Sequence, residues 1–276
     1  MASLNARSDG GHSNAAESSL RGRVNGHERR ANPLWLDCPL RQGIAWAAEL
    51  GARSGLSPML DSGTLLGLQR DGALLPNDLD LDLTLCLSSE SDLRCLQEAL
   101  AGLRYNLWTF ENRPFKVEIE SGATDLPLAI DIKLFRMTRQ GWVCPSVYPV
   151  WRGYMGSGGA HDGQSLRRRA RAWARCRWRR AIARGDTANW PLRDIMHADA
   201  WVVPDMFLSE VESVPGYPDC VRPRQWQQYL TYRYGDWTRP VGDWVYWRDD
   251  GAYRRLGAED DSGGHLDDLR RLWASS

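Results

Sequence analysis

The stretch from Leu60 to Leu85 constrains the fold of this chain more than any other. It ends in three aspartates that alternate with three leucines: Asp78, Leu79, Asp80, Leu81, Asp82 and Leu83. Successive side chains of a β-strand point to opposite faces, so this alternation predicts a strand with leucines against a core and aspartates on the other face. A strand with a solvated acidic face and no further role is the structural alternative.

The three carboxylates of this stretch also carry a chemical prediction. Aspartates two residues apart on one strand are separated by roughly 7 Å, and ionised ones repel each other unless a cation lies among them. Mg²⁺ is bound in this way, by a few carboxylate oxygens together with substrate phosphates. We therefore predict a site for Mg²⁺, or Mn²⁺, at Asp78, Asp80 and Asp82.

A small turn precedes the acidic strand. Ser62, Gly63 and Thr64 follow a short apolar run and open a segment, 65–69, that is long enough for one or two helical turns. The first N–H groups of a helix have no partner within it and suit an anion such as phosphate. Phosphate donors, Arg70 and a metal site in one short stretch are the parts that phosphoryl transfer needs.

The same stretch, GTLLGLQRDGALLPNDLDLDL, resembles the signature of the LicD and fukutin-related family, which runs approximately GGTLLGxxRxGxxIPWDxDxDI. The matching residues are Gly63, Thr64, Leu65, Leu66, Gly67, Arg70, Gly72, Pro76, Asp78, Asp80 and Asp82. Asn77 replaces the usual Trp of the family, and Ser62 replaces a Gly. The resemblance implies an α/β (α+β) nucleotidyltransferase-like fold, with a small mixed β-sheet flanked by helices.

The resemblance also implies an activity. Members of this family are phosphotransferases that move phosphocholine, ribitol phosphate or a similar group from a CDP-linked donor to a hydroxyl of a glycan or glycolipid. It implies that Asp80 and Asp82 bind the metal, with Asp78 as a further ligand or an outer partner. Ser62, Gly63 and Thr64 would then hold the donor phosphates.

A second segment, YLTYRYGDWTRP, resembles the family's closing element, YLxxxYGxxWxxP. The matching residues are Tyr229, Leu230, Tyr234, Gly235, Trp237 and Pro240. Read without the family, the pattern predicts a helix from about 223 to 234 that docks on the core. Gly235 is expected to end it, since a glycine in the left-handed conformation often follows a helix.

Two strands are predicted between these matches, at 115–119 and 128–135. In the second, AIDIKLF, Asp131 and Lys133 share one face and apolar residues share the other. The resemblance implies that Asp131 is catalytic, either completing the metal site or accepting the proton of the acceptor hydroxyl. Lys133 and Arg70 would offset the charge of the donor phosphates. A charged pair on an exposed strand face is the alternative.

Other elements follow from local patterns. Apolar spacing predicts a helix at 39–51 that ends at Gly51, and one at 91–101 with Ser89 or Ser91 as its N-cap. A hairpin strand is expected at 142–144 after a turn at Gln140 and Gly141, and a short strand at 201–203.

The chain is expected to divide into three parts. Residues 1–32 are rich in Ser, Asn, Gly and Arg and are predicted to be disordered, 33–244 to form the catalytic domain, and 245–276 to be a C-terminal tail. An arginine-rich insertion, 161–186, has no counterpart in the family. It can be a solvated helix face, a patch for an anionic acceptor or membrane surface, or a nucleic-acid contact. The net charge of zero argues against nucleic acid.

Composition bounds the location. The six cysteines form no CxxC pair, no signal peptide is recognisable, and no apolar run has the length of a transmembrane segment. A cytoplasmic enzyme is therefore expected, or a Golgi enzyme if an N-terminal anchor precedes this chain. Two other functions share these features: a nucleotidyltransferase that acts on a small molecule or nucleic acid, and a non-catalytic relative that binds glycan or regulates a partner.

Overall fold

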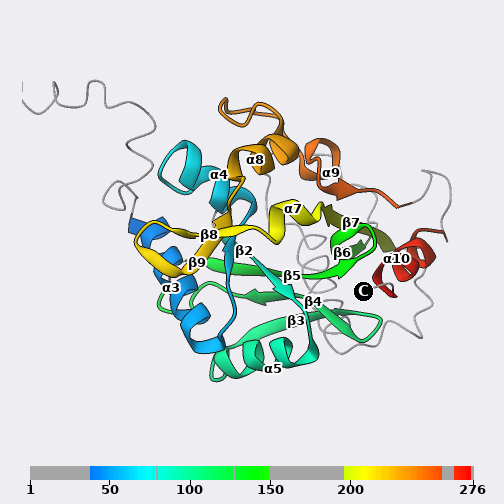
Figure 1. Ribbon diagram of the computed structural model, residues 1–276, viewed down its shortest axis with the longest axis horizontal. Helices are drawn as coiled ribbons and strands as arrows, with labels where there is room; N and C mark the ends of the chain where they lie inside the picture. The colour runs from blue at the N-terminus through cyan, green and yellow to red at the C-terminus, as the bar shows by residue number, and fades with distance from the viewer. Residues whose placement is uncertain are drawn as a thin grey trace, which may run out of the picture.

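The computed structural model describes residues 38–76, 78, 80–126, 128–149, 196–256 and 264–274. The predicted disordered segment 1–32, the arginine-rich insertion 161–186 and Leu79 lie outside the described residues. The chain forms a mixed α+β fold in which helices flank one mixed sheet, which confirms the α+β class that was predicted (Figure 1). The sheet has ten strands among the described residues, so it is larger than the small sheet expected.

The strands are not in chain order across the sheet. Eight follow the order β10-β7-β6-β5-β2-β1-β9-β8, while β3 pairs with β4 and β4 pairs with β5. Only the β2–β5 and β1–β9 pairs are parallel. The strands are β1 (Met59–Leu60), β2 (Asp80–Leu87), β3 (Tyr105–Phe110), β4 (Arg113–Ile119), β5 (Ala129–Thr138), β6 (Gly141–Pro149), β7 (Met196–Val203), β8 (Val211–Val214), β9 (Tyr217–Pro223) and β10 (Tyr253–Arg254).

Strand β5 has two partners along one of its edges. β2 runs along the other edge over residues 129–136, while β4 pairs with residues 130–133 and β6 with residues 136–138. A single edge can bond to only one strand at each position, so β4 and β6 pair with successive parts of this edge. Both strands contribute side chains to the cavity described below.

The predicted alternation holds within β2 and β5. Leu81 and Leu83 are fully buried, and Asp80 and Asp82 lie on the opposite, partly exposed face. The prediction is wrong for Asp78, which precedes the strand. Its backbone N–H donates to the carbonyl oxygen of Leu75 at 2.9 Å, so a turn rather than a strand places this side chain.

Helices cover both faces of the sheet. In Figure 1, α4, α8 and α9 lie above the sheet in the view, and α3 and α5 lie below it. Ser89 caps α5 through a reciprocal capping box with Asp92, as the serine-rich start predicted. The helices are α3 (Cys38–Ser54), α4 (Ser62–Arg70), α5 (Glu90–Ala99), α7 (Asp205–Leu208), α8 (Trp226–Tyr234), α9 (Tyr246–Asp249) and α10 (Gly264–Ala274).

Helix α3 was predicted to end at Gly51, but it continues to Ser54. A Cβ atom at Gly51 would lie 2.4 Å from the carbonyl oxygen of Asp219 in β9, closer than packed atoms approach. The glycine therefore lets the helix pack tightly against β9. The left-handed residue that follows the helix is Gly55, at φ +68°.

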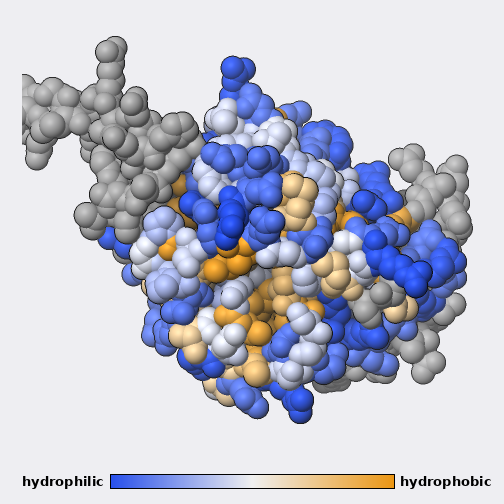
Figure 2. All heavy atoms as spheres, in the orientation of Figure 1, coloured by the Kyte–Doolittle hydropathy of each residue, from blue (hydrophilic) through white to orange (hydrophobic). Residues whose placement is uncertain are grey.

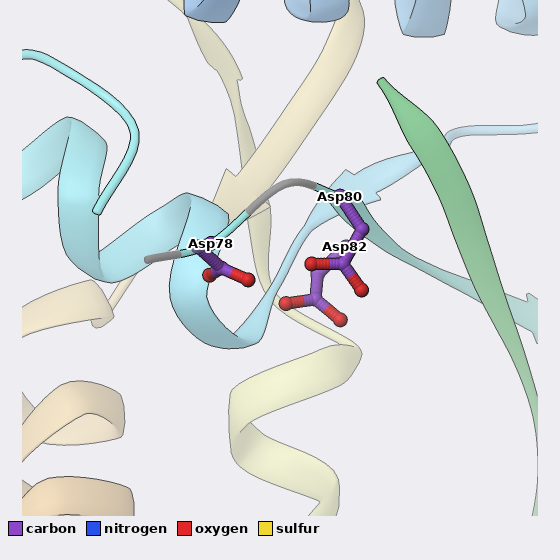
Figure 3. Close-up of side chains that lie close together, drawn as sticks. All are labelled: Asp78, Asp80 and Asp82. Carbon is purple, nitrogen blue, oxygen red and sulfur yellow. The ribbon is translucent and has the colours of Figure 1, made fainter. Parts of the chain in front are cut away.

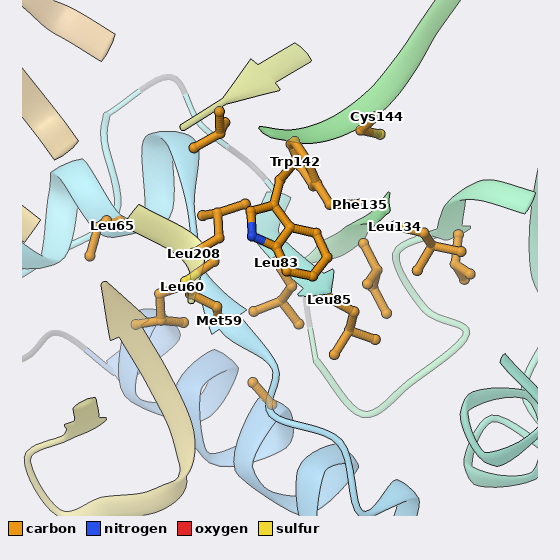
Figure 4. Close-up of a cluster of buried hydrophobic side chains, with 14 of the residues drawn as sticks. Met59, Leu60, Leu65, Leu83, Leu85, Leu134, Phe135, Trp142, Cys144 and Leu208 are labelled. Atoms are coloured by element: carbon orange, nitrogen blue, oxygen red, sulfur yellow. The ribbon is translucent and has the colours of Figure 1, made fainter. Parts of the chain in front are cut away.

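The hydrophobic core lies on both faces of the sheet, and Figure 4 shows part of it. Leu83 and Leu85 belong to the face opposite the aspartates. Met59, Phe135 and Trp142 are in register with Thr84, Cys86 and Met137, so they pack on the other face, beyond the polar residues. Full burial of one such side chain stabilises the fold by about 1.5–3 kcal/mol. On the face seen in Figure 2, hydrophilic side chains cover most of the surface and hydrophobic ones gather in a depression near the centre.

The segment after residue 244, expected to be a tail, contributes to the fold. β10 pairs with β7, α10 packs against β6 and β7, and Trp273 at the end of α10 is 1% exposed. The signal was present in the sequence, because Leu269, Leu272 and Trp273 recur with helical spacing. No helix in the described part of the chain combines the length and hydropathy needed to cross a membrane.

Candidate metal centre and its cavity

Three carboxylates converge beside the N-terminus of α4. One oxygen from each of Asp78, Asp80 and Asp82 lies within 4.8 Å of the other two. Figure 3 shows the side chains turned toward one another, Asp80 and Asp82 from the start of β2 and Asp78 from the segment between α4 and β2. Closely spaced carboxylate oxygens are the ligand set that a hard divalent cation takes.

Burial and mutual repulsion disfavour charge on this cluster. The pKa of Asp78 is raised to about 8 by burial, by a hydrogen bond with Asp80 and by the neighbouring negative charges. The pKa of Asp82 is raised to about 6 by burial and by nearby carboxylates, against the opposing charge of Lys133. A cation among the three would relieve both effects, so the residues present fit a divalent metal ion.

Gly63 provides the space for this cluster. A Cβ atom at position 63 would lie 1.9 Å from Oδ2 of Asp78 and 3.5 Å from Oδ2 of Asp82. The N–H of Gly63 also donates to Oδ2 of Asp82 at 3.1 Å. The close approach of Asp78 requires a glycine at this position, because the Cβ atom of any other residue would displace the carboxylate.

The start of α4 is helical, as predicted, but its first amides already have carboxylate partners. The N–H of Ser62 donates to Oδ1 of Asp61 at 2.7 Å, and that of Gly63 to Asp82. Thr64 is fully buried and its Oγ1 accepts from the N–H of Asp82 at 2.8 Å, so it ties α4 to β2 and does not line the cavity. Ser62 and Gly63 do line it.

Strand β5 brings Asp131 and Lys133 to the polar face beside β2, as predicted. Asp131 is in register with Asp82, and its Oδ2 accepts from Nζ of Lys116 on β4 at 2.6 Å. Nζ of Lys133 lies 2.5 Å from Oγ of Ser62 and 3.6 Å from Oδ1 of Asp82. Burial opposes the charge of Lys133, but Asp82 and Asp61 outweigh it and raise its pKa.

Arg70 reaches the cavity from the last turn of α4. Its guanidinium pairs with the carboxylate of Asp71, with Nη2 2.8 Å from Oδ2. The side chain also lines the cavity and keeps part of its surface exposed. A phosphate would therefore compete with Asp71 for this group.

A buried hydrogen-bond network that the sequence did not predict lies behind the cluster. Its centre is Asp61, which accepts from the hydroxyl of Tyr229 at 2.7 Å, from Nη1 of Arg233 at 2.5 Å and from Oγ1 of Thr84 at 2.8 Å. Burial alone would raise the pKa of Asp61, but the charges of Arg233 and Lys133 outweigh it and hold the pKa well below the usual range.

Arg233 extends this network to the C-terminal segment. Its Nη2 lies 2.6 Å from Oδ2 of Asp250, and Nη1 also donates to Oγ of Ser62 at 3.1 Å. Tyr229 and Arg233 lie in the second matched segment, which the sequence marked only as a docking helix. Asp250 lies beyond the predicted domain boundary and had no local signal.

These residues surround a cavity of about 970 Å³, near the upper end of the range for small-molecule sites. Its acidic side includes Glu118 on β4, which the sequence did not single out and whose Oε2 accepts from the indole N–H of Trp108 at 3.0 Å. Aromatic residues also line the cavity, among them Trp201, Tyr234, Trp244 and Tyr246. Val241 lies at the rim, with 57% of its surface exposed.

The fold and this site together define a class: a mixed α+β protein with a large cavity over a candidate divalent-metal centre. No model of a known protein family matches the chain, and neither does any curated protein. The family resemblance therefore depends on the two sequence motifs described above.

Proposed function

We propose that this protein is an Mg²⁺-dependent phosphotransferase with a nucleotidyltransferase-like domain, which moves a phospho-alcohol group from a CDP-linked donor to a hydroxyl of a glycan or glycolipid. The observation that carries the proposal is the convergence of Asp78, Asp80 and Asp82 in a large cavity, next to Lys133 and Ser62. Carboxylates for a metal and donors for phosphate are the two requirements of this chemistry.

Each site residue has a role in the proposal. Asp80 and Asp82 would hold Mg²⁺ or Mn²⁺, with Asp78 as the third ligand across Gly63. The metal ion, when bound, would neutralise negative charge that develops on the transferred phosphate. Lys133 and the hydroxyl of Ser62 would donate to the donor phosphates.

The remaining predicted donor-binding residues contribute differently. Arg70, near the last turn of α4, would add positive charge at the side of the cavity. Gly63 contributes space, and Thr64 acts only by fixing α4 to β2. Thr64 is therefore proposed as a positioning residue and not as a phosphate contact.

The transfer itself forms one bond and breaks one. The oxygen of the acceptor hydroxyl bonds to the phosphorus that carries the alcohol, and the bond from this phosphorus to the bridging oxygen breaks. CMP leaves with the electron pair, and the hydroxyl proton passes to a carboxylate. Asp131, which lines the cavity beside Asp82 and is held by Lys116, is the proposed base.

A donor screen followed by a transfer assay tests this function. CDP-choline, CDP-ribitol and CDP-glycerol are compared by thermal shift with and without Mg²⁺, and the stabilising donor is then used in radiolabelled form with candidate glycan acceptors. Asp80→Asn and Asp82→Asn should each reduce transfer at least about 100-fold without unfolding the protein, because each removes charge stabilisation. Asp219→Asn, on the exposed surface of β9, is the matched control.

Three outcomes would contradict the proposal. Full transfer by the Asp80→Asn and Asp82→Asn variants would exclude the assigned metal centre. Incorporation of label from a nucleoside triphosphate in place of a CDP-alcohol would indicate a nucleotidyltransferase. Absence of any Mg²⁺-dependent donor binding would favour a non-catalytic relative.

A further inference from the structure

An aromatic wall lines the cavity next to the metal centre. It consists of Trp201 on β7, Tyr234 on α8, Trp244, and Tyr246 on α9, all of which line the cavity. The rings of Trp201 and Tyr246 are stacked, with centroids 6.0 Å apart, and those of Tyr234 and Trp244 have centroids 5.0 Å apart. Trp201 lies more than thirty residues before the other three, so the fold brings it to them.

The wall begins beside the metal centre and leads away from it. Nζ of Lys133, which lies 3.6 Å from Asp82, is 5.0 Å from the ring centroid of Trp201. Arg233 lies over Trp201 at 4.9 Å and over Tyr234 at 5.5 Å. Tyr234 in turn contacts Trp244. A ligand with its phosphates at the carboxylates can therefore reach the wall with its other end.

Trp244 has an unused hydrogen-bond donor in this wall. Its Nε1 is shielded from solvent and has no hydrogen-bond partner among the described residues. An indole N–H can only donate, and a buried donor without an acceptor is energetically unfavourable. A ligand that places an acceptor atom at this position would remove that cost.

The chemistry of the wall favours a flat ring over a sugar. A pyranose carries several hydroxyl groups, each of which needs a partner when it is buried. The wall lines the cavity with aromatic surface, and Arg233, which contacts Trp201 and Tyr234, is already paired with Asp250. A nucleobase stacks on aromatic rings without such a need and has carbonyl or ring-nitrogen acceptors on its edge.

We propose that this wall binds the base of the nucleotide donor, and that Nε1 of Trp244 donates a hydrogen bond to an acceptor atom on the edge of that base. The identity of the ligand as a nucleotide rests on the proposed function. The assignment makes Trp244 a specificity residue, because it selects for an acceptor at one position of the ring.

Calorimetric titration of the full chain tests this assignment, with CMP as one ligand and pyrophosphate with Mg²⁺ as the other. Trp244→Phe keeps an aromatic ring and removes the N–H, so it should weaken CMP binding about five- to tenfold. It should leave pyrophosphate binding unchanged, because pyrophosphate has no base. Trp247→Phe, in α9 but away from the cavity lining, should change neither affinity.

The outcomes separate this inference from the proposed function. Three results would overturn the base site. Trp244→Phe could leave CMP binding unchanged, it could weaken the binding of CMP and of pyrophosphate equally, or the unaltered chain could fail to bind CMP. Weaker binding of an oligosaccharide acceptor in place of CMP would also overturn it, in favour of a sugar site. If the chain binds CMP in a way that depends on Trp244 but transfers no phospho-alcohol, the base site is supported and the proposed function is contradicted.

Discussion

Gly63 illustrates, at the scale of a single residue, how a position without a functional group can control a metal centre. Asp78 approaches so closely that a Cβ atom at position 63 would lie 1.9 Å from its Oδ2. The clash is with the carboxylate that is proposed as the third ligand. Asp78 would have to move away from Asp80 and Asp82, which would open the cluster.

We therefore predict that Gly63→Ala weakens Mg²⁺ binding about ten- to a hundredfold, the range found when a residue that orients metal ligands is lost. Mg²⁺ titration by calorimetry measures this directly. Gly242→Ala is the matched control, because a Cβ atom at position 242 meets no atom within 4 Å. An Mg²⁺ affinity that Gly63→Ala leaves intact would exclude Asp78 from the ligand set.

At the scale of elements, the site depends on how α8 is joined to α4. Arg233 on α8 is 2% exposed and bridges Asp61, the N-cap of α4, to Asp250 after α9. Replacing one partner of a buried ion pair leaves an uncompensated charge. We predict that Arg233→Met lowers the free energy of unfolding by about 3–5 kcal/mol, measured by urea denaturation.

Arg239→Met is the control for this change, because the side chain of Arg239 is 84% exposed and should contribute less than about 1 kcal/mol. The triple change of Arg233→Met with Asp61→Asn and Asp250→Asn should recover part of the lost stability, since no charge is then left unpaired. Equal stability of Arg233→Met and the unaltered chain would show that the network contributes nothing to the fold.

Helix α10 gives a second prediction at this scale. Trp273 is buried although the sequence placed it in a tail, so α10 should unfold together with the sheet. Trp273→Ala is expected to cost about 3–5 kcal/mol in urea denaturation. Arg271→Ala, on the exposed side of the same helix, should have little effect. A wild-type unfolding midpoint for Trp273→Ala would mean that α10 is not part of the domain.

At the scale of the whole molecule, we expect the carboxylates to make stability depend on pH and on a bound metal ion. The pKa values of Asp78 and Asp82 rise from 3.8 in the unfolded chain to about 8 and about 6 in the fold. Between pH 4 and these raised pKa values the folded state binds more protons than the unfolded chain. The stabilising contribution of the two carboxyl groups is therefore fully present below pH 4 and is lost as the pH rises through about 6 for Asp82 and about 8 for Asp78. Asp61 acts in the opposite sense, because its lowered pKa makes its contribution disappear as the pH falls below 4.

We predict that the melting temperature of the metal-free protein is a few degrees lower at pH 8 than at pH 5. Mg²⁺ at pH 8 should restore this loss, because the cation compensates the charges that repel each other. Asp78→Asn should flatten the profile and reduce the effect of Mg²⁺. A metal-free protein that is equally stable at pH 5 and pH 8 would contradict the raised pKa values.

Local interactions explain what could be predicted from the sequence. The alternation in β2 and β5, the N-cap of α5, the glycine after α8 and the hairpin between β5 and β6 depend on neighbouring residues, so short patterns predicted them. The same reasoning grouped Asp80 with Asp82 and Asp131 with Lys133, because residues at alternate positions share a strand face. It failed for Asp78 and Gly51, where a turn and a close approach to another strand replaced the regular pattern.

The amino-acid sequence by itself determined the candidate acidic ligands, the glycine at the start of α4 and most of the elements that carry them, since each is encoded within a short stretch. Only the tertiary structure decided which distant residues complete the site. Tyr229 and Arg233 bond to Asp61 from 168 and 172 residues away, and Trp244 and Asp250 reach the cavity from a segment that looked like a tail. A contact of this kind leaves no periodic pattern, because its free energy depends on burial and geometry that exist only after the chain has folded.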